Sequence, residues 1–381
     1  MKYNKINGTD VSLLGFGLMR LPRLSGKESA IDVSASAKLI DHAIANGVNY
    51  FDMAYTYNGS EEFAGQALSK YPRDSYQLAT KCPPWKINNE DDFERIFNQQ
   101  LRRAKTDYFD YYLIHNFAQE AMRAGGNTES FERFERIGFH GMLEKKKKEG
   151  KIKALGFSFH GTIELLENFV NKYEVDFGQL QINYVDWTTT DAKTQYEILN
   201  SRNIPITIME PLRGGALANL PADAAKLLKD ANPNASIASW GFRYVASLPG
   251  VVTVLSGMND MRQLNDNIAI MSNLKPITEQ EKALLYEAAA VMKKSGAIGC
   301  TGCEYCLPCP VGVNIPSVFS IYNHGKMLGY KIPFDNGYAT LAEDEKASAC
   351  IKCGVCVDKC PQHLDIPKSM QEVDNYAKSG G

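Results

Sequence analysis

Residues 47–57 read Gly47-Val48-Asn49-Tyr50-Phe51-Asp52-Met53-Ala54-Tyr55-Thr56-Tyr57. The run Asn49–Ala54 is short, aromatic and apolar on both faces, which is typical of a buried parallel strand. It follows an amphipathic stretch, Ala35–Asn46, and Gly47 stands where that helix should stop, because glycine readily adopts the left-handed cap conformation. The sequence therefore predicts a helix followed by a strand that ends near Asp52.

The same alternation of apolar run and amphipathic stretch recurs along the chain. The other predicted strands are Leu13–Gly17, Tyr76–Lys81, Asp110–His115, Ala154–Ser158, Gly178–Tyr184, Pro205–Glu210 and Val251–Gly257. The other predicted helices are Asp92–Lys105, Phe134–Glu149, Ile163–Tyr173, Ala192–Asn200, Ala235–Ser247 and Met261–Met271. Eight strand–helix units in about 260 residues are typical of an α/β fold of the (β/α)8 or TIM-barrel type. A doubly wound open sheet is the alternative, but Gly15-Phe16-Gly17 lacks the third glycine of the dinucleotide-binding turn.

Eight of the nine cysteines lie in the C-terminal part of the chain, in two runs. The first run is Cys300, Cys303, Cys306 and Cys309, followed by Pro310, and the second is Cys350, Cys353, Cys356 and Cys360, followed by Pro361. The second run has the C-x2-C-x2-C-x3-C-P spacing with which bacterial ferredoxins hold [4Fe–4S] clusters. Thiolates are soft ligands that suit such clusters, and the cysteine before proline usually serves the other cluster of a pair.

Two other uses of cysteine fit this pattern less well. Disulfide frameworks belong to short secreted chains, whereas here a long stretch with Cys82 as its one cysteine precedes the two runs. Structural zinc sites usually leave wider gaps between cysteine pairs. The formal net charge of -2 gives no indication of nucleic-acid binding or of an anionic membrane surface. The chain has no apolar run long enough to span a bilayer, and its N-terminus lacks a signal-peptide core, so we expect a cytoplasmic protein.

The cysteine-rich tail is expected to form a small, mainly helical ferredoxin-like domain. A predicted helix, Thr278–Ser295, leads out of the barrel, and Gly296–Gly299 is expected to act as a hinge. We therefore predict a barrel domain over residues 1–295 and an iron–sulfur domain over residues 296–381. Within the tail, one helix is predicted at Ile315–Leu328 and a loop rich in Gly, Pro and Asp after it. The residues after Cys309 echo those after Cys360, which is the duplication expected of a two-cluster module.

Four polar residues follow neighbouring predicted strands, and such barrels place their chemistry at the C-terminal strand ends. Asp52, Lys81 and His115 end three of the strands, and Tyr57 lies in the loop after Asp52. Tyr57 can donate a proton to a carbonyl oxygen as hydride reaches the carbon. Lys81 would lower the pKa of that phenol and Asp52 would hold Lys81 in place, while His115 would orient or polarise the carbonyl.

With these motifs in place, residues 1 to about 290 resemble the aldo-keto reductase superfamily. The matching stretches are Gly47–Tyr57, Leu78–Lys81 and Asp110–His115. The resemblance implies that Asp52, Tyr57, Lys81 and His115 are the family's catalytic tetrad. Tyr55 is a rival for the tyrosine, and the family pattern favours Tyr57.

The resemblance also implies that NADP, or NAD, binds in an extended form across the strand ends. Ser158 and Gln181 would hold the nicotinamide carboxamide, and Pro211, Leu212, Arg213 and Gly214 would border the pyrophosphate. Gly257, Met258, Gln263 and Asn267 would frame the adenosine, with Gly17, Met19 and Met209 as further contacts. The chain departs from the family at Phe159, where Asn is usual, and at Met209, where an aromatic residue is usual. The loop Gly257–Asp260 lacks the Lys or Arg that normally meets a 2′-phosphate, and Arg262 is a nearby substitute.

The tail resembles the ferredoxin-like extension found on one branch of these reductases. The resemblance implies one cluster on Cys300, Cys303, Cys306 and Cys360, and a second on Cys350, Cys353, Cys356 and Cys309. The first run has two residues rather than three between its third and fourth cysteines. If that run is degenerate, one cluster is expected, on the second run.

Three functions are compatible with this combination. The first is an NAD(P)H-dependent reductase that interconverts an aldehyde or ketone and an alcohol, with clusters that shape the site or sense redox state. The second is an enzyme coupled to an electron-transfer protein partner through a flavin or a substrate radical, because hydride carries two electrons and a cluster accepts one. The third is a nucleotide-sensing regulatory module. The complete tetrad argues against the third, and we favour the first.

Overall fold

The computed structural model describes residues 1–24, 30–116 and 129–379, the side chains of residues 129–131 excepted. The chain forms two compact units. The first contains Met1–Pro211 and Phe242–Ile277, and the second contains Leu212–Gly241 and Thr278–Gly381. The boundary expected between residues 295 and 296 remains a prediction.

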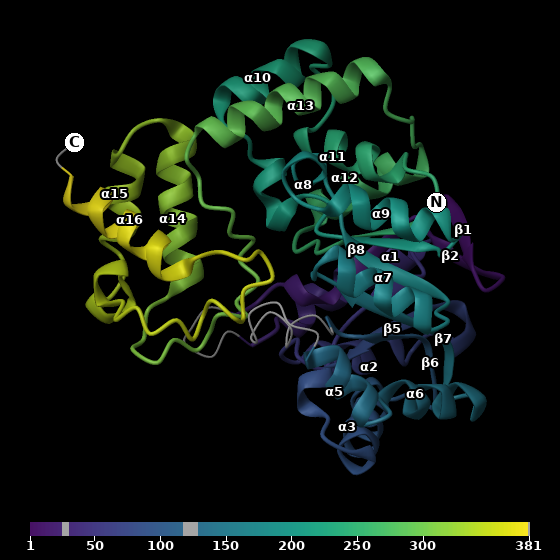
Figure 1. The fold of residues 1–381 in the computed structure, drawn as a ribbon. Coiled ribbons are helices and arrows are strands. Elements are labelled where there is room, and N and C mark those ends of the chain that lie inside the picture. The colour runs from purple at the N-terminus through teal and green to yellow at the C-terminus, as the bar shows by residue number, and fades with distance from the viewer. Residues whose placement is uncertain (25–29, 117–128, 380–381) are drawn as a thin grey trace. The chain divides into compact units, whose positions relative to one another are not determined.

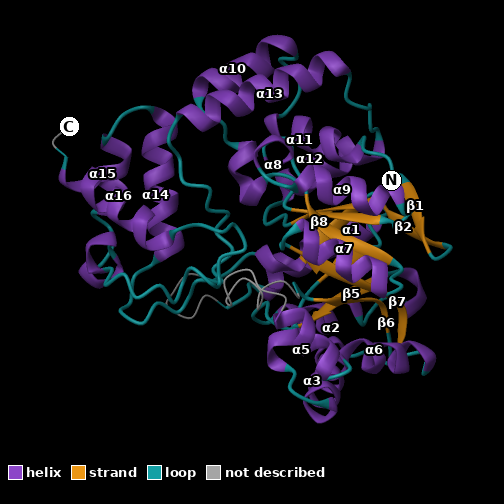
Figure 2. Ribbon diagram, viewed as in Figure 1, coloured by secondary structure: helices purple, strands orange, loops and turns teal. Residues whose placement is uncertain are grey.

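The first unit contains a closed barrel of eight parallel strands (Figure 2). The strands are β3 (Leu14–Gly17), β4 (Tyr50–Asp52), β5 (Gln77–Cys82), β6 (Phe109–Ile114), β7 (Ile152–Phe159), β8 (Phe177–Gln181), β9 (Ile206–Met209) and β10 (Val251–Ser256). Strand β10 pairs with both β9 and β3, which closes the barrel. Each predicted apolar run overlaps one of these strands, so the predicted TIM barrel is confirmed.

The interior of the barrel is filled by side chains rather than open. Tyr50, Ala79 and Tyr111, on three successive strands, belong to one buried apolar cluster. An antiparallel hairpin of β1 (Tyr3–Ile6) and β2 (Thr9–Ser12), which the sequence analysis did not predict, adds the buried Ile6 and Val11 to that cluster. The packed interior leaves the C-terminal strand ends as the place for a site.

Helices surround the barrel in the order expected from the sequence. They are α1 (Val33–Ala45), α2 (Ser60–Leu68), α3 (Glu90–Ala104), α5 (Glu129–Arg136), α6 (Phe139–Lys148), α7 (Ile163–Lys172), α8 (Asp186–Thr189), α9 (Ala192–Ser201), α11 (Ile237–Ala246) and α12 (Met261–Ser272). The prediction of one helix over Phe134–Glu149 was wrong, because Gly138 adopts a left-handed φ of 66° between α5 and α6. Gly47, Gly150 and Gly250 have φ of 83°, 73° and 75°, as expected where helices stop.

The second unit is mainly helical. It contains α10 (Ala222–Ala231), α13 (Glu279–Lys294), α14 (Ile315–Leu328), α15 (Ile332–Tyr338) and α16 (Ile366–Lys378). Figure 1 shows α10 beside α13, and α14, α15 and α16 grouped near the C-terminus. Helix α14 has the predicted bounds, but the segment after it is not only a loop, because α15 forms there and buries Phe334 against α14.

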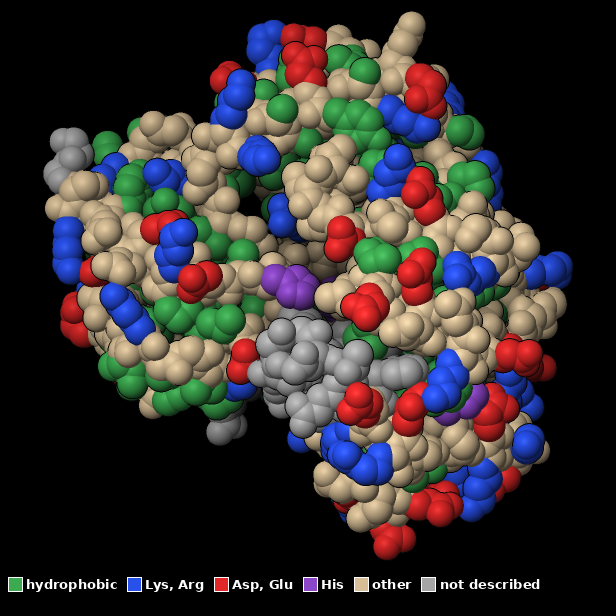
Figure 3. Space-filling model, in the orientation of Figure 1, with side chains coloured by type: hydrophobic (Ala, Val, Ile, Leu, Met, Phe, Trp, Pro, Cys, Tyr) green, Lys and Arg blue, Asp and Glu red, His purple; other side chains and the backbone are tan. Residues whose placement is uncertain are grey.

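The charged surface is mixed in sign. On the face drawn in Figure 3, basic and acidic side chains are interspersed among polar and apolar ones. Among the described residues, no helix has the length and apolar character needed to cross a bilayer.

Candidate functional site

A buried ion pair lies at the C-terminal ends of β4 and β5. The Lys81 ammonium donates to Asp52 Oδ2 over 2.6 Å and to the Met53 carbonyl over 3.0 Å. The exposed fractions of Lys81 and Asp52 are 1% and 3%. Burial lowers the pKa of Lys81 and raises that of Asp52, and in each case the charge of the partner opposes the effect. Each group therefore depends on the other to remain charged.

Tyr57 and His115 lie beside this pair. The Lys81 nitrogen is 5.0 Å from the centroid of the Tyr57 ring. The rings of Tyr57 and His115 meet edge to face, with centroids 5.9 Å apart and planes at 89°. The structure thus brings together Asp52, Tyr57, Lys81 and His115, which come from three strand ends and one loop.

His115 is held in a buried, neutral form. Burial lowers its pKa well below the usual range, and the charges of Lys81 and His160 lower it further. Its Nδ1 lies 3.4 Å from Thr56 Oγ1, and the Trp85 ring packs at 5.5 Å between centroids. A neutral imidazole beside Lys81 can donate or accept a hydrogen bond without adding a second positive charge.

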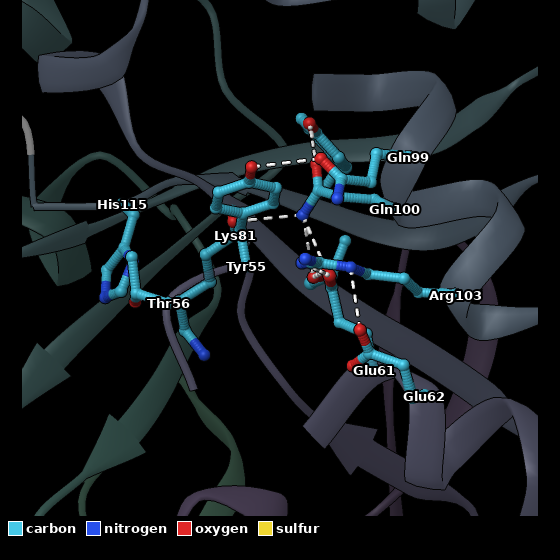
Figure 4. Close-up of polar contacts among 11 residues, drawn as sticks. Tyr55, Thr56, Glu61, Glu62, Lys81, Gln99, Gln100, Arg103 and His115 are labelled. Atoms are coloured by element: carbon cyan, nitrogen blue, oxygen red, sulfur yellow. Dashed lines mark hydrogen bonds and ion pairs between the residues drawn. The ribbon is translucent and has the colours of Figure 1, made fainter. Parts of the chain in front are cut away.

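The rival tyrosine, Tyr55, is directed elsewhere. Its hydroxyl donates to Gln99 Oε1 over 3.0 Å, and the Arg103 guanidinium lies 4.8 Å from its ring centroid. Figure 4 shows the Tyr55 hydroxyl directed to Gln99, while the Lys81 side chain extends away from that contact. The ring of Tyr57 therefore lies beside the Lys81 ammonium, whereas the Tyr55 hydroxyl binds Gln99.

A buried polar network contacts the backbone of Lys81, and it was not predicted from the sequence (Figure 4). Glu61 Oε1 accepts from Thr80 Oγ1 and from Gln100 Nε2, each over 2.7 Å, while Arg103 pairs with Glu61 Oε2 at 3.3 Å. Gln100 Nε2 also lies 3.2 Å from the Lys81 carbonyl. Burial raises the pKa of Glu61, opposed by these hydrogen bonds. The network holds the backbone of β5 at Lys81, and no sequence motif predicts it.

The residues expected to hold the nicotinamide lie at the ends of β7, β8 and β9. Ser158 is buried, and its Oγ accepts from the Asn116 amide over 3.1 Å. Gln181 donates its Nε2 to Asp186 Oδ2 over 2.7 Å, an interaction that the sequence did not indicate. Met209 lies with its sulfur 3.6 Å from Gln179 Nε2.

The side chain at the position of the family's usual Asn is part of the core. Phe159 is fully buried, and its ring packs edge to face against Phe157 at 6.4 Å. At the position where the sequence departs from the family pattern, the side chain is therefore an apolar packing group.

The segment after β9 has a strained backbone. Glu210 and Arg213 adopt left-handed φ of 52° and 47°, and Gly214 and Gly215 follow with 68° and 100°. Asn183 Nδ2 donates to the Glu210 carbonyl over 3.2 Å. Left-handed conformations at non-glycine residues cluster at functional sites, because the surrounding structure must hold them.

The residues expected at the adenosine end adopt an ordered arrangement in the first unit. Asp260 caps α12 by accepting from the Gln263 amide over 2.7 Å, and Asn267 donates to Ser256 Oγ over 3.0 Å. Met258 is buried, and Gly17 ends β3 next to the short helix that carries Met19. A Cβ on Gly257 would lie 3.0 Å from the Arg20 side chain, so Arg20 is a cation at this loop that the sequence analysis missed.

The eight C-terminal cysteines line two cavities in the second unit, and each cavity takes cysteines from both runs. Cys300, Cys303, Cys306 and Cys360 line a cavity of about 320 Å3, open solvent included. The cavity lined by Cys309, Cys350, Cys353 and Cys356 has a volume of about 350 Å3 on the same measure. This is the crossed grouping that the resemblance implied.

The chemistry of the two cavities fits iron–sulfur clusters. Burial raises the pKa of the Cys306 thiol, and Cys303, Cys300 and Cys360 raise it further. Such thiols lose their protons when a metal binds. Among the described residues, no three His, Cys, Asp or Glu side chains are grouped as ligands of a single ion. Four thiols spread around an otherwise mainly apolar cavity suit a cubane, which is wider than one ion.

The backbone of the two cysteine runs repeats. Gly302, Glu304 and Gly312 have left-handed φ of 64°, 66° and 89°, and the equivalent positions in the second run, Lys352, Gly354 and His363, have 57°, 78° and 53°. Each run then leads into a helix, capped by Asn314 in one case and Asp365 in the other. The duplication expected from the sequence is thus present in the backbone.

Comparisons with known proteins agree with both parts of the chain. The sequence model of the Aldo/keto reductase family matches residues 13–290, and that of the 4Fe-4S dicluster domain matches residues 299–364. An uncharacterized oxidoreductase, YqkF of Bacillus subtilis, is 26% identical over 72% of this chain and 92% of its own length. The NADH-specific methylglyoxal reductase of Escherichia coli is 21% identical, over 77% of this chain and 100% of its own length.

Solved structures show the same fold. The holo form of the aldo-keto reductase AKR11C1 from Bacillus halodurans aligns with a TM-score of 0.60 and 23% identity, over 76% of this chain and 96% of its own. An aldo/keto reductase from Klebsiella pneumoniae, solved with NADP and acetate, aligns with a TM-score of 0.59 and 20% identity, over 74% of this chain and 93% of its own.

Proposed function

Because the chain belongs to the aldo/keto reductase family, we propose that it interconverts an aldehyde or ketone and an alcohol by hydride transfer with NAD(P)H. The observation that carries this proposal is the buried Lys81–Asp52 pair beside Tyr57, with His115 against the ring of Tyr57. All four groups lie at the strand ends where barrels of this kind place their chemistry.

When bound, the reduced nicotinamide supplies a hydride to the carbonyl carbon of the substrate. Tyr57 then donates the proton of its hydroxyl to the carbonyl oxygen. The Lys81 ammonium stabilises the phenolate that remains, and Asp52 keeps Lys81 charged and in position. His115, neutral at its buried position, orients the carbonyl oxygen by hydrogen bonding. In the oxidative direction, Tyr57 accepts the proton of the alcohol.

For the cofactor, we propose NADP. The support is the presence of two cations at the expected adenosine loop. The side chain of Arg20 lies against Gly257, and the Arg262 guanidinium lies 3.8 Å from Asp260, the N-cap of α12. The Klebsiella relative was solved with NADP, which agrees with this choice. Ser158 and Gln181 would hold the carboxamide, and Pro211 would border the pyrophosphate. Comparing the dissociation constants of NADPH and NADH tests the preference.

Residues 299–364 form a 4Fe-4S dicluster domain. We propose two clusters, held by the two crossed sets of four cysteines that line the cavities. We also propose that the second cluster exchanges electrons with a protein partner. Cys353 is exposed there, between Ile351 and Val355, whose exposed fractions are 62% and 45%. Under this proposal, adding a reduced carrier protein bleaches the visible absorbance of the clusters.

The decisive experiment compares Tyr57→Phe with Tyr55→Phe in anaerobically purified protein. Oxidation of NAD(P)H is followed with a panel of aldehydes and ketones. We expect Tyr57→Phe to reduce kcat by about 100- to 10,000-fold, the usual contribution of a general acid. Tyr55→Phe should retain activity, because Tyr55 binds Gln99 rather than facing Lys81. Equal activity in the two variants would refute the assignment.

A further inference from the structure

The loop after β9 reaches the first cysteine run within the second unit. A Cβ on Gly214 would lie 2.1 Å from the Thr301 carbonyl oxygen, so the backbone of the loop touches the backbone between Cys300 and Cys303. This approach is possible because glycine has no side chain, and glycine also tolerates the left-handed φ of 68° at this position. Thr301 itself is buried and lines the first cavity.

Arg213 extends from this loop toward the same cysteine run. A Cβ on Gly299, one residue before Cys300, would lie 2.9 Å from Arg213 Nη2 and 3.6 Å from its Cζ. The same Cβ would lie 3.7 Å from Leu364, a residue that lines the first cavity. The guanidinium is therefore beside the polypeptide that carries the first ligand of that cavity. The sequence analysis had placed Arg213 at the pyrophosphate instead.

The two cavities differ in their charged surroundings. The first cavity has one charged lining residue, Glu304. The residues that line the second cavity carry no charged side chain. A cluster bound by four thiolates is negatively charged, and each electron that it accepts adds to that charge. A nearby cation therefore stabilises the reduced form and a nearby carboxylate opposes it, since local charge helps to set cluster potentials.

We propose that the charge of Arg213 raises the reduction potential of the cluster held by Cys300, Cys303, Cys306 and Cys360. This inference rests on the proposed assignment of that cluster. It gives Arg213 an electrostatic role in the iron–sulfur domain, although Arg213 belongs to the loop that follows a barrel strand. We expect a smaller effect on the second cluster, because Arg213 lies beside Gly299, the residue before Cys300.

The test is a redox titration of the anaerobically purified full-length protein, with each cluster followed by electron paramagnetic resonance. For Arg213→Gln, we expect the reduced-to-oxidised ratio of one cluster at a fixed solution potential to fall by about tenfold. For a one-electron couple, this equals a shift of about 59 mV. Glu304→Gln should shift the same couple in the opposite direction. Lys352→Gln, which removes a charge next to Cys353, should leave that couple unchanged.

Arg213→Lys is the control for misfolding, because lysine keeps the positive charge while changing the side chain. If Arg213→Lys shifts the couple as far as Arg213→Gln does, charge is not the cause and the inference is overturned. It is also overturned if Arg213→Gln leaves both potentials unchanged while raising the dissociation constant of NADPH, which would assign Arg213 to the nucleotide.

Failure of the underlying assignment has a separate signature. Protein with full aldehyde reductase activity but without iron and acid-labile sulfide would refute the cluster assignment and, with it, this inference. Protein with two titrating clusters but no hydride transfer would refute only the proposed reaction.

Discussion

Replacing Asp52 with Asn tests the proposed mechanism at its most buried contact. Asp52 and Lys81 are almost fully buried, and their 2.6 Å contact opposes the effect of burial on the pKa of Lys81. Breaking a buried pair by removing one charge costs about 3–5 kcal/mol. In the variant no carboxylate opposes the effect of burial on Lys81, so the pKa of Lys81 falls further below its ordinary value.

The lower pKa of Lys81 determines how the activity of the variant depends on pH. The ammonium form of Lys81 exists below its pKa and disappears as pH rises through it. In Asp52→Asn this loss occurs at lower pH than in the wild type, so the phenolate of Tyr57 loses its stabilising charge at a lower pH. We expect kcat/KM to fall by about 100-fold or more at pH 8, and to recover in part as the pH is lowered.

The assay is the pH profile of kcat/KM for an aldehyde that the wild type reduces, with thermal unfolding measured in parallel. Asp110→Asn is the matched control. Asp110 is also a buried carboxylate, but it pairs with Arg73 at 2.7 Å and accepts from the Leu78 amide over 2.8 Å. Its loss should lower stability without changing the pH profile. If both variants lose activity in proportion to stability, with profiles of wild-type shape, the reasoning about Lys81 is wrong.

Further predictions concern the cysteine domain and the histidine. Gly214→Ala should lower the free energy of unfolding by about 1–3 kcal/mol more than Gly215→Ala does, because only the Cβ at position 214 meets the Thr301 oxygen, at 2.1 Å. Thermal unfolding measures both variants, and equal effects would show that the left-handed backbone alone matters. Cys309→Ser should remove the cluster of the second cysteine run and leave that of the first, as iron analysis and electron paramagnetic resonance will show; loss of the first instead would contradict the crossed grouping. His115 should remain neutral in nuclear magnetic resonance titrations from pH 6 to 8, because its pKa is lowered well below 6.5; protonation in that range would contradict its proposed role.

The barrel could be predicted because its strands are apolar on both faces and three of its helices are followed by left-handed glycines, Gly47, Gly150 and Gly250. The same rules failed where a glycine lies inside an amphipathic pattern. Gly138 interrupts the expected helix over Phe134–Glu149, because its backbone turns left-handed there. The hairpin β1–β2 was missed because its strands are short and largely polar, with Ile6 and Val11 as their buried apolar residues.

The candidate tetrad could be read from the sequence because each member follows a strand in a family motif. Its supporting residues could not. Glu61 and Gln100 lie on helices, where a charged or amide side chain is normally taken to face water. Their burial depends on partners from two strands and another helix, which only the fold brings together. Asp186 was missed for the same reason, because its bond to Gln181 depends on the turn after β8.

The exchange of ligands between the two cysteine runs has a consequence for how the protein matures. Neither run alone supplies four thiols to one cavity, so a nascent chain that ends before Cys350 offers the first cavity only three. The second cavity gains its fourth thiol at Cys356 and the first at Cys360, so neither set is complete until the second run has been synthesised. Loss of a whole run therefore removes thiols from both cavities, whereas loss of a single cysteine affects only the cavity that it lines.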